Sequence, residues 1–567
     1  MVVVSVSRYL YTRLAQLGVR SLHGVPGDFN IASLDELAKS GLKWVGNCNE
    51  LNAGYAADGY ARVKKIGALA STYGVGELSS INAIAGSYAE NVPVVQIVGQ
   101  PSRKVLQSGR LFHHSLGDSS TGVFADMHRR VTAAQTTLDD PLTATREIDR
   151  VLKACIDSKK PVYIGKKVEI VSKANTANER SYPRRRGTPS NLFLVYEILR
   201  KLHNAERPVL LVDAGARQHG LVDIVQQLMI QMNIPTVTTP MGKSIVNESL
   251  PNFHGVYDGA DSGITEMVRS ADLVISIGAI RSDLNTFGFM AIIDPAVEIS
   301  LDHNSVVLET IKHEIPTKAV LENLIRELKD TELRFPSLPP LRPTKNTLAP
   351  EVFPEELRRS FPSTSITHEY LWPRISSWLK PKDIILNSSG TSNVGICETK
   401  FPPESLGISQ VLWSSIGYTL AAAQGAALAA EELGGGRRVV VFEGDGAFQM
   451  TAQEISTMLK LKLKPIIFVL NNEGYTIERW INGPSESYND VGDWNYAGLP
   501  HMFGAGNDAL KTYKVETRAQ LESLLADSSF GDAPCLQLVE LRMPKEDAPL
   551  GVKRLIEQIV TKKAPVH

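Results

Sequence analysis

Two short polar groups in the last quarter of the chain have the residue types and the spacing of a diphosphate and metal site. Gly444-Asp445-Gly446 precedes Asn471-Asn472, and the 24 residues 447–470 lie between them. A glycine-rich turn lets backbone N–H groups approach a phosphate, and carboxylate and amide oxygens are ligands that Mg²⁺ prefers. Either group alone would indicate an ordinary turn. The pair at this spacing predicts a bound diphosphate and a hard cation.

The surrounding sequence predicts the β-α-β unit that would position these two groups. Residues 438–442 and 466–470 are short apolar runs, which are typical of buried strands. Thr451, with Glu454 three residues later, predicts a capping box that opens a helix between the strands, and Pro465 would end that helix. Both polar groups would then lie at the carboxyl ends of parallel strands, where open α/β sheets bind ligands.

Composition and charge limit the partners that the chain could have. The 567 residues are 43% hydrophobic with a formal net charge of −1, so several cores can form and no basic surface for nucleic acid is indicated. Four cysteines lie far apart without metal-ligand spacing, which favours a reducing compartment. The sequence also lacks an apolar run long enough to span a membrane. We expect a cytosolic enzyme that acts on a small molecule, with no nucleic-acid or membrane partner.

Alternating helical and strand patterns predict an α/β fold with three domains. Each domain would be an open parallel sheet with helices on both faces. We expect these domains at residues 1–175, 191–335 and 364–567. The polar stretch 172–190 and the proline-rich tract 336–362 would link them. The third domain contains both groups of the expected diphosphate site.

Further motifs are spread over nearly the whole chain. They are Val25-Pro26-Gly27-Asp28-Phe29-Asn30, Asn49-Glu50-Leu51-Asn52-Ala53, Ala56-Ala57-Asp58-Gly59-Tyr60-Ala61-Arg62, Tyr73-Gly74-Val75-Gly76-Glu77-Leu78-Ser79, His113-His114 and Glu473-Gly474-Tyr475-Thr476-Ile477-Glu478. With the two polar groups, they resemble the motifs of thiamine diphosphate-dependent 2-oxo acid decarboxylases of the pyruvate decarboxylase type. The resemblance implies thiamine diphosphate and Mg²⁺ as cofactors and a 2-oxo acid as the substrate.

Five residues match catalytic positions of this family. Thiamine is activated when a carboxylate bound to its pyrimidine ring favours the imino form of its amino group, and Glu50 matches that carboxylate. Glu478 would lie near the carboxylate that is lost. Asp28, His113 and His114 would manage protonation and aldehyde release. Outside this context, Glu50 would be a helix N-terminal glutamate and a lone histidine would be structural.

The same resemblance assigns the residues that would hold the cofactor. Asp445, Asn472 and Gly474 would be the metal ligands, through carboxylate, amide and backbone carbonyl oxygens. Ile416 would be a stiff β-branched support beneath the cofactor. The other expected cofactor contacts are Glu50, Thr72, Gly390, Thr391, Ser414, Ser415, Gly444, Gly446, Ala447, Tyr475, Thr476 and Ile477.

The resemblance also implies an oligomer. Glu50 and the diphosphate groups lie in different predicted domains, and members of this family bind the cofactor between subunits. We therefore expect at least a homodimer in which two chains build each site. Members of the family are commonly homotetramers, so the resemblance favours a homotetramer.

Two departures from the family pattern concern substrate activation and substrate size. Residues 213–217, the apparent counterpart of a segment that carries an activator cysteine in yeast-type relatives, contain no cysteine, so thiol-based activation is not supported. Ser389 stands where pyruvate-selective relatives often carry the larger threonine, which would widen the substrate pocket.

Three alternatives to a pyruvate decarboxylase follow from the sequence. One is a decarboxylase of larger aromatic or branched 2-oxo acids, such as phenylpyruvate or indolepyruvate. Another is a thiamine diphosphate carboligase, which the pair His113-His114 together with Glu478 disfavours. The third is a catalytically silent homologue that forms filaments or scaffolds, and the complete set of catalytic residues argues against it.

Overall fold

The computed structural model describes most of the chain. The described residues are 4–108, 110–118, 120–167, 171–172, 190–259, 262–329, 361–483, 485–506 and 508–563. The two expected linkers, 172–190 and 336–362, lie almost wholly outside these residues, and the expected domain boundaries stay predictions. Within the described residues, the helices are too short or too polar to cross a membrane.

The N-terminal sheet has six strands that all run parallel. Their order across the sheet is β3 (Lys43–Trp44), β2 (Ser21–Gly24), β4 (Gly67–Thr72), β5 (Val94–Gln100), β7 (Val162–Lys167) and β6 (Gln135–Leu138). The helices of this region are α1 (Val6–Gln16), α2 (Ile31–Leu34), α3 (Glu50–Lys64), α4 (Val75–Ala89), α5 (Arg103–Gln107), α6 (Gly122–His128) and α7 (Ala144–Ser158). A separate antiparallel pair joins β1 (Val4–Ser5) to β8 (Val171–Ser172).

The middle sheet has seven strands, of which the last two run antiparallel to their neighbours. Their order is β11 (Phe253–Val256), β10 (Thr236–Thr238), β9 (Pro208–Val212), β12 (Leu273–Ile277), β13 (Glu298–Asp302), β14 (Ser305–Leu308) and β15 (Ile311–Glu314). Its helices are α8 (Ser190–Asn204), α9 (Gly215–Gln218), α10 (Val222–Met232), α11 (Gly263–Arg269) and α12 (Thr317–Leu328).

The C-terminal sheet has six parallel strands. Their order is β17 (Leu406–Ile408), β16 (Ile384–Asn387), β18 (Val439–Gly444), β19 (Ile466–Asn471), β21 (Leu536–Arg542) and β20 (Leu510–Val515). The helices are α14 (His368–Trp378), α15 (Thr391–Gly395), α16 (Tyr418–Glu432), α17 (Asp445–Thr451), α18 (Glu454–Lys460), α19 (Thr476–Asn482), α20 (Leu499–Met502), α21 (Arg518–Ala526), α22 (Ser528–Gly531) and α23 (Leu550–Lys563). Short 3₁₀ turns are η1 (Ala38–Ser40), η2 (Ile396–Glu398) and η3 (Ser487–Asn489).

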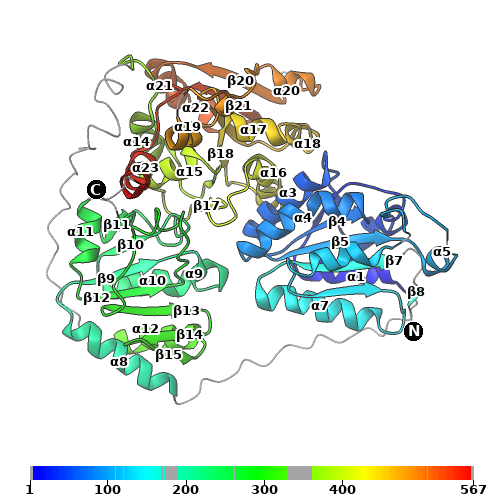
Figure 1. The fold of residues 1–567 in the computed structure, drawn as a ribbon, viewed down its shortest axis with the longest axis horizontal. Helices are drawn as coiled ribbons and strands as arrows, with labels where there is room; N and C mark the ends of the chain where they lie inside the picture. Colours follow the sequence, from blue (N-terminus) through cyan, green and yellow to red (C-terminus); the bar gives the residue numbers. More distant parts are fainter. Residues whose placement is uncertain are drawn as a thin grey trace.

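The predicted fold class is confirmed, since three largely parallel sheets carry interleaved helices (Figure 1). Strand β18 shows why the apolar runs become central strands. Its residues alternate between two hydrophobic cores, with Val439 and Val441 in one and Val440 and Phe442 in the other. A strand covered by helices on both faces needs apolar residues at every position, and this requirement produces the continuous run.

The predicted capping box at Thr451 is wrong. Thr451 is the last residue of α17, and its hydroxyl donates to the Gly417 carbonyl at 2.8 Å. Glu454 opens α18, but its carboxylate accepts hydrogen bonds from the side chains of Asn47 and Asn52 in the N-terminal region. Both side chains are therefore used in tertiary contacts. Helix α18 also ends at Lys460, five residues before the proline expected to stop it.

Helices α3 and α16 lie side by side where the N-terminal and C-terminal regions meet (Figure 1). Their backbones touch at two glycines. A Cβ atom at Gly59 would lie 2.0 Å from the carbonyl oxygen of Ala422, and one at Gly425 would lie 1.8 Å from that of Ala56. No side chain larger than hydrogen fits at either position without a backbone shift. The two glycines therefore set the distance between these helices.

We expect Gly425→Ala to destabilise the protein although alanine is the better helix former. The added methyl group must push α16 away from α3, and overpacking of this kind costs about 1–3 kcal/mol of unfolding free energy. Urea unfolding followed by circular dichroism measures the change. The control is Gly122→Ala, because a Cβ atom at the start of α6 would have open space within 4 Å. Equal midpoints for the two variants would contradict the packing argument.

Candidate active site

The two polar groups found in the sequence meet at Asp445. Strands β18 and β19 are parallel neighbours, with Gly444 opposite Leu470, and α17 begins at Asp445 directly after β18. The Asp445 carboxylate accepts the N–H of Gly446 at 2.7 Å and the N–H of Gly474 at 2.9 Å. Burial raises the pKa of Asp445 to about 6, while these two hydrogen bonds act in the opposite direction. The structure thus joins the expected turn to the end of the next strand.

Asn472 and Gly474 follow β19 at the same edge of the sheet. The side-chain amide nitrogen of Asn472 donates a hydrogen bond to the Thr476 hydroxyl at 2.8 Å. This bond involves the amide N–H group and not the amide oxygen. Gly474 has φ of 125°, and a Cβ atom there would lie 2.1 Å from the Asn489 carbonyl oxygen. Only glycine fits this position. A buried carboxylate and an adjacent amide oxygen are a donor set that suits a hard cation.

The expected contacts before α15 and α16 border the same edge. Gly390 has φ of 113°, and a Cβ atom there would meet open space. The hydroxyl of Ser414 donates to Ser389 at 3.0 Å, and Ser414 itself has a left-handed φ of 55°. Ile416 remains 37% exposed although it is a large apolar residue. The segment before α16 thus exposes part of an apolar side chain, as a support for a ring would require.

Other expected cofactor residues lie on the same elements. Gly444, Gly446 and Ala447 belong to the β18–α17 junction, Thr391 opens α15, and Ser415 bonds the Tyr55 hydroxyl at 2.6 Å. Tyr475, Thr476 and Ile477 lead into α19, where the exposed Glu478 follows. These C-terminal candidates therefore lie at the ends of strands of the C-terminal sheet or in the segments that follow them.

A second cluster of candidates lies in the N-terminal region. The Nε2 atom of His113 lies 2.8 Å from an oxygen of Asp28, and ligand atoms of Asp28, His113 and His114 are all within 4.8 Å of one another. Phe29 contacts both imidazole rings, with centroids 5.3 Å and 6.4 Å away. The hydroxyl of Tyr73 donates to the His113 carbonyl. An acid and two imidazoles held this closely can share and transfer protons.

Glu50 opens α3 and lies beside Thr72 at the end of β4. A Cβ atom at Gly76 would lie 2.8 Å from Glu50 Oε1 and 3.1 Å from a methyl carbon of Thr72. The Thr72 hydroxyl is buried and has no hydrogen-bond partner among the described residues. An unpaired buried hydroxyl costs free energy. The place beside Glu50 and Thr72 therefore suits a ligand that would form a hydrogen bond with this hydroxyl.

Among the described residues, the two clusters are not joined by direct polar contacts between their catalytic candidates. In the described part of the chain, no hydrogen bond or ion pair joins Glu478 to Asp28, His113 or His114. Glu50 likewise makes no such contact with Asp445 among those residues.

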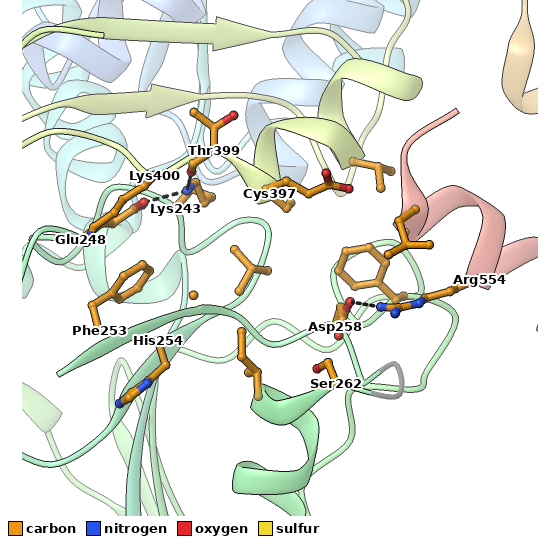
Figure 2. Close-up of a pocket in the computed structure, with 18 residues that line it drawn as sticks. Lys243, Glu248, Phe253, His254, Asp258, Ser262, Cys397, Thr399, Lys400 and Arg554 are labelled. Carbon is orange, nitrogen blue, oxygen red and sulfur yellow. Dashed lines mark hydrogen bonds and ion pairs between the residues drawn. The ribbon is translucent and has the colours of Figure 1, made fainter. Parts of the chain in front are cut away.

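A cavity of about 460 Å³ lies elsewhere, where the middle region meets the start of α23 (Figure 2). Four of its charged wall residues form two ion pairs, since Lys243 lies 2.7 Å from Glu248 and Arg554 lies 3.7 Å from Asp258. None of the candidate site residues lines it. The cavity is therefore separate from both clusters.

A buried carboxyl group, that of Glu77, is connected to the histidine pair through Gly74. Glu77 accepts the N–H of Gly74 and the hydroxyl of Tyr163, each at 2.9 Å. Gly74 in turn touches the His114 carbonyl, because a Cβ atom at Gly74 would lie 2.2 Å from that oxygen. Burial raises the pKa of Glu77 to about 7, although both hydrogen bonds act to lower it.

Comparisons with known proteins show which domains and relatives the chain is similar to. Three models of the thiamine pyrophosphate enzymes match the chain: the N-terminal TPP binding domain at residues 4–132, the central domain at 195–328 and the C-terminal TPP binding domain at 390–536. A pyruvate decarboxylase of Aspergillus fumigatus is 47% identical over 98% of this chain and 96% of its own length. Pyruvate decarboxylase isozyme 1 of Saccharomyces cerevisiae is 38% identical over 98% of both chains.

We expect Glu77→Gln to change how stability depends on pH. The folded state holds the Glu77 proton up to about pH 7, whereas the unfolded chain releases it near 4.5, so ionisation of the unfolded chain lowers the free energy of unfolding increasingly as pH rises across that window. The variant stays neutral and should gain up to roughly 3 kcal/mol relative to the native protein between pH 4.5 and 7. Urea unfolding at several pH values measures this difference. Parallel pH profiles for the two proteins would contradict the assignment.

Proposed function

Because the chain belongs to the pyruvate decarboxylase family of thiamine diphosphate enzymes, we propose that it removes CO₂ from a 2-oxo acid and releases the aldehyde, with pyruvate as the simplest substrate. The observation that carries this proposal is the cluster of Asp28, His113 and His114. A decarboxylase must return a proton to the carbon that loses CO₂, and this cluster offers groups that hold and deliver one.

The C-terminal residues would hold the diphosphate through Mg²⁺. Asp445 and Asn472 would supply side-chain oxygens, and Gly474 would supply its carbonyl. The first N–H groups of α17 would face the diphosphate at the positive end of the helix. When bound, thiamine diphosphate supplies the group that accepts the electrons left behind as CO₂ departs.

The N-terminal residues would act on the pyrimidine ring and on protons. Glu50 would bind a ring nitrogen, and the unpartnered Thr72 hydroxyl beside it would complete the polar contact. Asp28 would orient the imidazole of His113 through the 2.8 Å bond, and the imidazole would hold a proton at Nε2. Glu478 would lie near the substrate carboxylate. Ile416 would support the cofactor from below.

We infer that two chains build each site. Among the described residues of one chain, no hydrogen bond or ion pair joins Asp28, His113 or His114 to Glu478, and a homodimer would place the N-terminal cluster of one subunit over the C-terminal cluster of the other. Exposed apolar residues near the C-terminal cluster support this inference, since Trp413 is 40% and Met450 is 54% exposed. A homotetramer and a cytosolic location stay predictions.

A larger 2-oxo acid is the second candidate substrate. The Ser389 hydroxyl accepts from Ser414 at 3.0 Å and contacts the Gln410 carbonyl at 3.4 Å, so it lies on the loop expected to border the cofactor. A serine there occupies less volume than a threonine. Phenylpyruvate and indolepyruvate are the substrates that such a pocket would accept.

We expect the purified protein to release CO₂ and aldehyde from 2-oxo acids only when Mg²⁺ and thiamine diphosphate are both present. A panel of pyruvate, phenylpyruvate, indolepyruvate and a branched 2-oxo acid distinguishes the two candidate substrates by kcat/KM. Chelation with EDTA should abolish turnover, and added Mg²⁺ should restore it. A cofactor-loaded protein that acts on none of these acids would refute the proposed reaction.

We expect Glu50→Gln to remove nearly all activity while the diphosphate still binds. The amide cannot accept a proton as the carboxylate does, so the amino group of the cofactor would not be activated. Loss of a general base of this kind typically costs a factor of about 10²–10⁴ in kcat. Steady-state kinetics with a parallel cofactor titration separate the two effects. Activity close to that of the native protein would exclude Glu50 from the activation step.

A further inference from the structure

Arg479 is a buried cation that the expected site residues do not include. It lies on α19 directly after Glu478 and is only 2% exposed. Its Nη1 atom donates to the Asn472 carbonyl at 3.2 Å, and its Nη2 atom donates to the Glu473 carbonyl. The guanidinium therefore binds the backbone of the loop that carries the proposed metal ligands.

Two further segments converge on the same side chain. Nη2 also donates to the Asn489 carbonyl at 3.3 Å and to the Asp490 carboxylate at 2.9 Å. Nη1 lies 3.4 Å from the Lys545 carbonyl, which also accepts the Thr476 hydroxyl at 3.0 Å. One guanidinium thus joins the loop after β19, the segment around η3 and the segment before α23.

The energetics favour a positioning role over an ion pair. Burying a guanidinium is costly, and Asp490, its carboxylate partner among the described residues, is half exposed, so the ion pair alone is a weak source of stability. The remaining acceptors are backbone carbonyls, which an apolar side chain would leave unpaired. An arginine at this position is useful because its planar fork reaches several carbonyls at once.

The loop that Arg479 binds has an unfavourable backbone. Glu473 adopts a left-handed φ of 61°, and Gly474 has φ of 125°. A Cβ atom at Gly474 would lie 2.9 Å from Nη2 of Arg479, and the Gly474 N–H donates to Asp445. Left-handed residues other than glycine cost free energy and persist when surrounding contacts hold them. The hydrogen bonds from Arg479 to the backbone carbonyls of this loop are contacts of this kind.

We propose that Arg479 is a positioning residue that sets the backbone of Asn472, Glu473 and Gly474 before Mg²⁺ and the diphosphate bind. This inference rests on the proposed function, since it concerns the same metal loop. Arg479 would act through the carbonyl groups that it binds and is not itself one of the proposed metal ligands. A preformed loop lowers the entropy lost on binding, so its effect falls on cofactor affinity more than on the chemical step.

The test is Arg479→Lys, which keeps the positive charge and loses the planar guanidinium with its several N–H donors. Apoenzyme would be titrated with thiamine diphosphate at fixed Mg²⁺, and binding followed by isothermal titration calorimetry. We expect Kd to rise at least about tenfold, while kcat at saturating cofactor stays within about threefold of the native value. A merely structural defect would not produce this combination of weaker cofactor binding and nearly unchanged turnover.

The matched control is Arg542→Lys. Arg542 contacts the same loop through the Glu473 carboxylate at 3.6 Å, and its other ion-pair partners are the carboxylates of Asp493 and Glu540. Its side chain is 29% exposed. Because lysine can replace an arginine that meets only carboxylates at such distances, we expect the control to keep the native Kd.

A second variant covers the case in which Arg479→Lys does not fold. Asp490→Asn removes the half-exposed carboxylate that orients the fork and leaves the buried cation in place. We expect a smaller rise in Kd, about threefold. Native affinity in every one of these two variants that folds would overturn the inference alone. Native protein that binds neither Mg²⁺ nor thiamine diphosphate would overturn the proposed function and this inference with it.

Discussion

The contact between α3 and α16 is the constraint on which the arrangement of the site depends. Glu50 is the first residue of α3, and α16 directly follows the loop that contains Ile416. Backbone contact at Gly59 and Gly425 leaves no room for the helices to shift closer or to roll without a clash. Each chain therefore fixes the relation between its N-terminal and C-terminal candidate residues through two positions that carry no side chain.

A buried polar network fixes the rotation of the same helix pair. The Asp58 carboxylate on α3 accepts hydrogen bonds from Arg62 at 2.7 Å, from Ser87 at 2.7 Å and from the Tyr418 hydroxyl at 2.6 Å. Tyr418 opens α16, so the carboxylate joins both regions of the chain. A buried carboxylate without these donors would be strongly destabilising, and a rotated helix would lose them. Glycine packing sets the separation of the helices, and this network sets their orientation.

The sequence predicted the parts of the fold that depend on local pattern. Strands β18 and β19 were predictable because burial on both faces demands continuous apolar runs, and the meeting of Asp445 with Gly474 follows from two neighbouring parallel strands. The capping box failed because Glu454 bonds residues about 400 positions away, which no local motif reveals. Arg479 was missed for a related reason. Its position after Glu478 is visible, but the three segments whose carbonyls it binds converge only in the folded chain.

The two halves of the proposed site differ in how far the single chain completes them. Asp445 and Asn472 are buried, and backbone and side-chain hydrogen bonds already hold them. Asp28 and His113 form their bond with side chains 53% and 58% exposed, so water screens the electrostatic attraction between them. Proton transfer to a carbon centre benefits from a site that excludes water. One chain thus already orders the expected anchor for the cofactor, whereas the exposed acid and base groups would gain low-dielectric surroundings in the proposed homodimer.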